Sequence, residues 1–93
     1  MLETSSILAD GMNKHEKTKE RILSGTSFAN VHFEDLCALL THLGFGSRVT
    51  ASSHHIFTRE GVSEIINLQP GRDGKAKPYQ VRQVRALIIM HNL

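Results

Sequence analysis

Apolar residues recur at helical spacing in two segments of the chain. In the first segment these residues are Phe33, Leu36, Leu39, Leu40 and Leu43. They mark one face of a predicted helix, which ends at Gly44. In the second segment they are Val81, Val84, Leu87 and Ile88. Pro78 precedes this second stripe and its fixed φ suits a first helical turn, so a helix is predicted from about Pro78 to His91. Both segments are therefore predicted to be amphipathic core helices.

Between these helices the period of the pattern falls to two, which is typical of strands. Residues 45–51 alternate, with Phe45, Val49 and Ala51 on one side of the pattern. Two further runs cover residues 53–58 and 63–68, and residues 59–61 between them predict a turn. Such short connections favour antiparallel hairpins. The predicted fold class is therefore α+β, with two layers in the order helix, three antiparallel strands, helix, and with one sheet face left open.

An extra helix is predicted ahead of this core. Asn13 and Glu16 have the spacing of a capping box, and Ser24 and Gly25 end the segment, so the helix runs from about residue 13 to 24. Because its apolar content is small, it either packs on the domain or is mobile. Residues 1–12 show no periodicity and are predicted to be a flexible tail. The remaining residues, 13–93, are predicted to form one domain, with the extra helix over 13–25 and the core over 33–93.

Length and composition exclude several classes of protein. The 93 residues are 40% hydrophobic and 22% charged, which is typical of one small globular domain. No stretch approaches the roughly 18–20 apolar residues that a membrane helix needs, so no membrane contact is expected. The lone Cys37 cannot form an internal disulfide, which agrees with a reducing compartment. A cytoplasmic location is therefore predicted.

The positive charge is concentrated near the end of the chain. The formal net charge is +2, but residues 71–93 carry five cations against Asp73 alone. The loop that leads into the helix at Pro78 contains Lys75 and Lys77, and the free amides and dipole of a helix N-terminus favour an anion. Two interpretations stay open at this point: a partner such as nucleic acid, or ordinary solvated charges.

Six histidines raise the question of a metal site. His54 and His55 are adjacent in a predicted strand, where successive side chains point to opposite faces, so the two cannot readily bind one ion. No other pair has helical or zinc-finger spacing. We therefore expect no metal and no other cofactor. One of the two adjacent histidines must face the open side of the sheet or its edge, and alternation alone does not decide which.

Residues 52–57 (SSHHIF), with residues 36–45 before them and Lys77, Pro78 and Tyr79 after them, resemble the HicA family of toxins from prokaryotic toxin–antitoxin systems. The resemblance covers residues 33–93 and implies a fold like that of a double-stranded-RNA-binding domain. The family's hallmark is Gly-Ser-His followed by an aromatic residue, and its histidine is catalytic. On this chain Ser53 matches the serine, His54 the catalytic histidine and Phe57 the aromatic.

Ser52 stands where the family usually has glycine. If that glycine adopts a positive φ, a serine there costs about 1–2 kcal/mol and shifts the loop before His54.

The resemblance implies a metal-independent endoribonuclease that cleaves mRNA and is inhibited by a HicB-type antitoxin protein. Such cleavage needs proton transfer at the 2′-hydroxyl and at the leaving oxygen, and imidazole, which titrates near about pH 6.5, suits either transfer. His54 is the predicted catalytic residue, and His55 and Tyr79 are two possible partners for it. The predicted RNA-binding residues are Ser53, Lys75, Lys77, Arg82 and Arg85.

Two other functions remain open on the sequence. The first is a non-catalytic RNA-binding module of the same fold, whose lysines and arginines hold phosphates. The second is an interaction protein whose open sheet face or last helix docks a partner.

Overall fold

The chain folds as an α+β protein in the element order that the sequence predicts. The structure, a computed structural model, describes residues 13–26 and 28–93. Its helices are α2 (Lys14–Ser24), α3 (Phe33–His42) and α4 (Pro78–His91), and its strands are β1 (Gly46–Val49), β2 (His55–Arg59) and β3 (Val62–Leu68). Two short 3-10 turns, η1 (Phe28–Asn30) and η2 (Arg72–Gly74), were not predicted. The predicted flexible tail, residues 1–12, lies outside the described residues.

Local capping explains why the helix ends fall close to their predicted positions. The Asn13 side chain accepts a hydrogen bond from Glu16 N at 2.8 Å, and Gly25 takes a left-handed φ of 72° after α2. Gly44, with φ 96°, follows α3. Pro78 is the first residue of α4, as predicted. These ends depend on residues within one or two turns, so they can be predicted without tertiary information.

The three strands form an antiparallel sheet in the order β1-β2-β3, so β2 is central. The register pairs Arg48 with Ile56 across β1 and β2, and Ile56 with Asn67 across β2 and β3. Phe57 and Ile66 form the next pair and point to the other face, because side chains alternate along a strand. Buried and exposed residues accordingly alternate at the end of β3.

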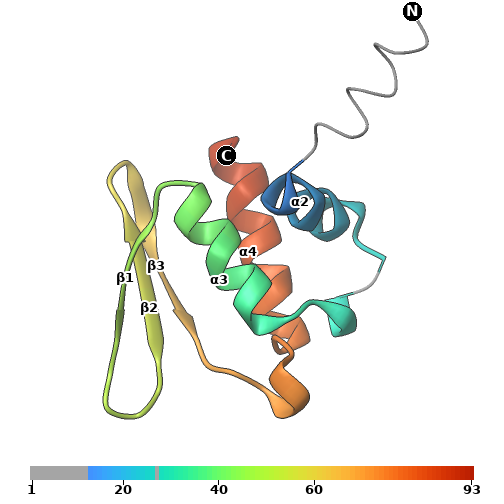
Figure 1. Cartoon of the computed structure of the whole chain (residues 1–93). Helices are drawn as coiled ribbons and strands as arrows, with labels where there is room; N and C mark the ends of the chain where they lie inside the picture. The colour runs from blue at the N-terminus through green and yellow to red at the C-terminus, as the bar shows by residue number, and fades with distance from the viewer. Residues whose placement is uncertain (1–12, 27) are drawn as a thin grey trace, which may run out of the picture.

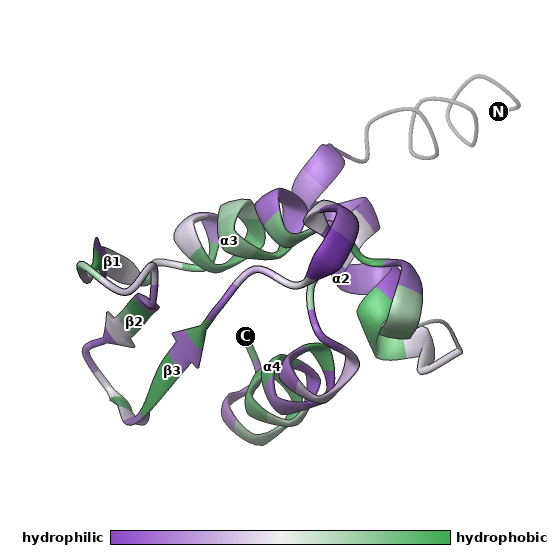
Figure 2. Cartoon of the chain, turned by 90° about the horizontal axis from the view of Figure 1, so that it is seen from below, coloured by the Kyte–Doolittle hydropathy of each residue, from purple (hydrophilic) through white to green (hydrophobic). Residues whose placement is uncertain are grey.

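All three helices lie on the same side of the sheet (Figure 1 and Figure 2). The hydrophobic core fills the space between α3, α4 and the helix-facing side of the strands. Its fully buried side chains include Leu36, Leu39, Leu40, Phe57, Ile66, Leu68, Val81 and Val84. Val49, an apolar position of the predicted alternation, is 60% exposed because it lies at the end of an edge strand. The two predicted core helices and the covered sheet face are thus confirmed.

The extra helix α2 packs against α3 and α4. Ile22 is completely buried and belongs to the single core cluster. Lys14 Nζ also lies 3.1 Å from Asp35 Oδ1 of α3. Of the two possibilities for this helix, packing on the domain is therefore the one observed. None of the helices in the described part of the chain is long and apolar enough to cross a membrane.

A hydrogen bond between side chains joins the sheet to the end of α4. His91 Nε2 lies 2.8 Å from Glu64 Oε1, and this hydrogen bond lowers the pKa of the Glu64 carboxyl below its usual value. The observed contact joins residues 27 positions apart, which sequence spacing does not reveal.

Candidate functional site

The connection between β1 and β2 places His54 next to the central strand. Thr50 N donates to His54 O at 3.0 Å, and Ser53 N donates to Thr50 O at 3.0 Å. Ser53 has a left-handed φ of 63°, so this is a three-residue hairpin loop whose last residue is left-handed. A non-glycine residue in that conformation costs about 1–2 kcal/mol. The cost considered for Ser52 was conditional on a positive φ there, and the structure places the positive φ at Ser53 and not at Ser52.

His54 lies on the sheet face that none of the helices within residues 13–26 and 28–93 covers, called the open face below, and two contacts orient it. Its backbone N–H donates to Thr50 Oγ1 at 3.2 Å, and its ring Nδ1 is 3.2 Å from Asn67 Oδ1 on β3. An amide oxygen can only accept, so in the neutral ring this contact requires the proton on Nδ1 and leaves the lone pair on Nε2. The His54 side chain is half-buried. This oriented imidazole can take up a proton at Nε2.

His55 points to the opposite face. Its ring packs edge-on against Phe33 of α3, with ring centroids 4.9 Å apart and an interplanar angle of 77°. The two adjacent histidines therefore lie on different sides of the sheet, as strand alternation predicts. His55 consequently does not share the open face on which the His54 ring lies.

Two of the predicted RNA-binding residues, Arg82 and Arg85, join α4 to the other helical segments. The Arg82 guanidinium lies 5.7 Å from the centroid of the Phe28 ring in η1. Arg85 Nε and Nη2 are both 3.4 Å from Leu23 O at the end of α2. Both contacts are on the helix side, so the structure does not bring these arginines together with the His54 ring.

Lys75 and Lys77 lie in the connection from β3 to α4. This connection starts at the same end of the sheet as the β1–β2 turn (Figure 1). It then runs to the start of α3, where Ala76 N donates to Val31 O at 2.8 Å. Gly71 N donates to Lys75 O, and Lys75 N donates to Arg72 O. Two amides of the loop that leads into α4, those of Lys75 and Ala76, are therefore already bonded within the protein, as is the amide of Gly71 just before it.

The hollow beside this loop is not basic. It has a volume of about 540 Å³, and its lining residues are His32, Phe33, Glu34, Asp35, Pro70 and Gly74. Its two carboxylates sit in the first turn of α3, where they interact favourably with the helix dipole. This arrangement does not favour an anion there. Tyr79, the other residue considered in this region, is 58% exposed in the first turn of α4.

A buried glutamine fixes the strand end beside His54. Gln80 is 2% exposed. With its amide nitrogen turned toward Gln69, it donates to Gln69 O at 3.2 Å and accepts from Gln69 N at 3.1 Å. The last pair of the β2–β3 register is His55 with Leu68, so the next pair beyond it is His54 with Gln69. Sequence reasoning missed Gln80 because a polar residue on an amphipathic helix is usually solvent-exposed.

Sequence reasoning also missed two residues that share the face of His54. Asn67 binds its ring, and Arg48 is exposed on β1 in the same cross-strand row as Ile56 and Asn67. Strand alternation separates both residues from the core positions. It does not reveal which residues become neighbours, because that depends on two registers: the β1–β2 register, which follows the turn at Ser53, brings in Arg48, and the β2–β3 register, which shifts between Phe57 and Arg59, brings in Asn67.

The cysteine and the remaining histidines do not form a second reactive centre. Burial, with a contribution from the Glu34 charge, raises the pKa of Cys37 to about 11, so this thiol is protonated at neutral pH. The rings of His15 and His42 stack with centroids 4.7 Å apart. Within residues 13–26 and 28–93, no group of three or more histidine, cysteine or acidic residues could hold a metal ion.

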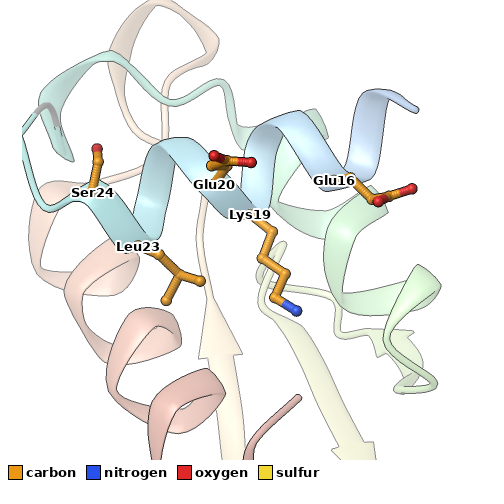
Figure 3. A pocket seen from close by; sticks show the side chains of 5 residues that line it. All are labelled: Glu16, Lys19, Glu20, Leu23 and Ser24. Carbon is orange, nitrogen blue, oxygen red and sulfur yellow. The ribbon is translucent and has the colours of Figure 1, made fainter. Parts of the chain in front are cut away.

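A further hollow runs along α2, on the helix side of the molecule (Figure 3). It has a volume of about 510 Å³, and it is lined by Glu16, Lys19, Glu20, Leu23 and Ser24. Lys19 and Leu23 point toward the end of α4, where Lys19 Nζ donates to Leu93 O at 2.6 Å. The hollow contains no histidine or cysteine, so its lining offers no group comparable to His54.

The fold and the site together define a small α+β protein with an oriented histidine on the open face of a three-stranded sheet. The chain matches no protein-family model, and neither a curated protein nor a solved structure matches it significantly.

Proposed function

We propose that this protein is a metal-independent endoribonuclease that cleaves single-stranded mRNA, with His54 as its catalytic residue. The observation that carries the proposal is the His54 ring on the open sheet face, where Asn67 Oδ1 holds Nδ1 and leaves Nε2 free. The resemblance of residues 52–57 to the HicA motif supports the same residue. We also propose that the α+β fold is of the double-stranded-RNA-binding-domain type.

In the proposed reaction, Nε2 of His54 accepts the proton of the ribose 2′-hydroxyl. The 2′-oxygen attacks the adjacent phosphorus, and the bond from phosphorus to the 5′-oxygen breaks. Water protonates the leaving 5′-oxygen, so the products are a 2′,3′-cyclic phosphate and a 5′-hydroxyl. A positioned general base contributes typically about 10²–10⁴-fold to such a step.

The proposed biological role is that of a toxin in a type II toxin–antitoxin system. A HicB-type antitoxin would inhibit it by covering the open sheet face and with it His54. Blocking one half-buried histidine on an uncovered face is sufficient to stop the proposed reaction, so the inhibitor need not distort the fold.

We expect the purified protein to cleave single-stranded RNA in the presence of a chelator. The fragments should carry 5′-hydroxyl ends, and a substrate with a 2′-deoxyribose at the cleavage position should remain intact there. Expression in a bacterial host should arrest growth, and co-expression of a cognate antitoxin gene beside it should relieve the arrest. RNA that is bound but stays intact would reject the enzyme in favour of the RNA-binding module, whose affinity should then fall in Lys75→Ala and Lys77→Ala.

Replacing Asn67 should alter the pH dependence of cleavage, because Asn67 acts through His54. In Asn67→Ala the ring loses the acceptor for its Nδ1 hydrogen. Because one hydrogen bond contributes about 1–1.5 kcal/mol, we expect kcat to fall about tenfold, with KM little changed. Asn67→Asp restores an acceptor, and its carboxylate favours the protonated ring. The acidic limb of the pH–rate profile should therefore move to higher pH in Asn67→Asp. Identical profiles for all three proteins would show that Asn67 does not position the histidine.

A further inference from the structure

One cation lies on the same sheet face as His54, although it was not among the predicted site residues. Arg48 pairs with Ile56, and His54 lies two residues before Ile56 on the same face. The hydrogen bond from Thr50 N to His54 O continues this pairing beyond the strands. Arg48 and His54 are therefore diagonal neighbours, a relation in which Cα atoms are about 7–8 Å apart and long side chains can meet over the same point.

The charge on this face has one sign. Within the described strands, Arg48 is the only charged residue on the open face. Arg59 reaches Gly44 behind the sheet, and Glu64 binds His91 of α4. No strand carboxylate on the open face therefore neutralises the Arg48 guanidinium. The field of this face favours an anion next to the His54 ring.

Arg48 also borders a shallow hollow on the sheet. The hollow has a volume of about 220 Å³, and its lining residues are Gly46, Ser47, Arg48, Ile56 and Thr58. Gly46 has no side chain to fill the space opposite Thr58, its partner in the ladder. The Gly46–Thr58 pair lies on the side of Arg48 away from His54, so the hollow extends from Arg48 toward the β2–β3 turn that carries Glu60. The hollow leaves open space beside the Arg48 side chain, but His54 does not line it, so the placement of Arg48 next to His54 rests on the diagonal pairing.

We propose that Arg48 is a second catalytic residue, whose guanidinium holds the scissile phosphate of RNA beside His54. This inference rests on the proposed function. The planar guanidinium donates to the two non-bridging oxygens of the phosphate, a geometry that arginine suits better than lysine. As the 2′-oxygen attacks and the phosphorane gains negative charge, Arg48 stabilises that charge. Arg82 and Arg85 do not have this role, since they contact Phe28 and Leu23 on the helix side.

The test compares Arg48→Ala and Arg48→Lys with Arg21→Ala. Arg21 is an exposed arginine of α2 on the helix side, so its replacement removes the same charge far from the open face. We expect Arg48→Ala to lower the single-turnover cleavage rate about 10²–10³-fold, as loss of one oxyanion donor does. Arg48→Lys should recover part of the rate, and Arg21→Ala should cleave like the wild type. Circular dichroism should show all three variants folded, because both arginines are exposed.

A binding arm separates this inference from the proposed function. Binding of an RNA with a 2′-deoxyribose at the cleavage position is measured over a salt series. Loss of one phosphate contact in Arg48→Ala should reduce the slope of log K against log salt by about 0.7. If the wild type cleaves and Arg48→Ala cleaves equally fast, the inference fails and the nuclease proposal stands. If the wild type leaves RNA intact, the nuclease proposal fails, and unchanged binding by Arg48→Ala would then also overturn the phosphate contact.

Discussion

His54→Ala is expected to lower RNA cleavage by about 10²–10⁴-fold and to leave the fold intact. The substitution removes the Nε2 lone pair that accepts the 2′-hydroxyl proton in the proposed reaction. It also removes the contact with Asn67 Oδ1 on the open face, but no core packing, because the ring faces away from the helices. Single-turnover cleavage with a chelator present measures the rate, and thermal unfolding monitored by circular dichroism checks the fold. Expression of the variant in bacteria should no longer arrest growth.

His55→Ala is the matched control for this variant. It removes the same side chain at the adjacent position, but from the face that packs against Phe33. Its cleavage rate should stay close to that of the wild type, provided the assay temperature lies well below its unfolding midpoint. Equal rates for wild type and His54→Ala, or loss of activity in His55→Ala alone, would contradict the assignment of the catalytic residue.

Phe57→Ala is expected to lower the free energy of unfolding by about 3–5 kcal/mol. Phe57 is 1% exposed on the central strand and pairs with the buried Ile66. Removing its ring leaves a cavity between the sheet and the helices. Small domains have a total stability of about 5–15 kcal/mol, so this loss consumes much of it. Urea unfolding of wild type and variant measures the difference.

Two neighbouring substitutions make this measurement specific. Phe57→Leu retains much of the apolar volume and should lose less stability than Phe57→Ala. Thr58→Val changes the next residue, which is exposed on the open face, and should stay within about 0.5 kcal/mol of the wild type. A Phe57→Ala midpoint equal to that of the wild type would show that the ring does not support the core.

These two predictions divide the motif of residues 52–57 into separate tasks. His54 and Phe57 are three residues apart, so along a strand they point to opposite faces. The aromatic residue stabilises the sheet against the helices, while the histidine lies on the uncovered face. Loss of activity should therefore accompany unfolding in Phe57→Ala but not in His54→Ala.

The contacts of the candidate site were less predictable than the fold. Arg82 and Arg85 were identified by their charge, but charge does not say whether a guanidinium contacts a ring or a carbonyl of its own protein. Asn67 and Arg48 carry no sequence signal beyond alternation. They become neighbours of His54 only through cross-strand registers. The turn at Ser53, with its left-handed φ on a non-glycine residue, sets the β1–β2 register that places Arg48, and the separate β2–β3 register places Asn67.

The sequence by itself determined the helices, their ends and the two faces of each strand. Periodicity and caps such as Asn13 and Pro78 act within one or two turns, so they do not depend on the rest of the molecule. Only the tertiary structure decided which sheet face the helices cover, and hence that His54 and not His55 is open. It also decided that Arg48 and Asn67 share the face of that ring and that Gln80 is buried against Gln69. Such contacts join residues distant in the chain, and only packing of the whole core fixes which of them meet.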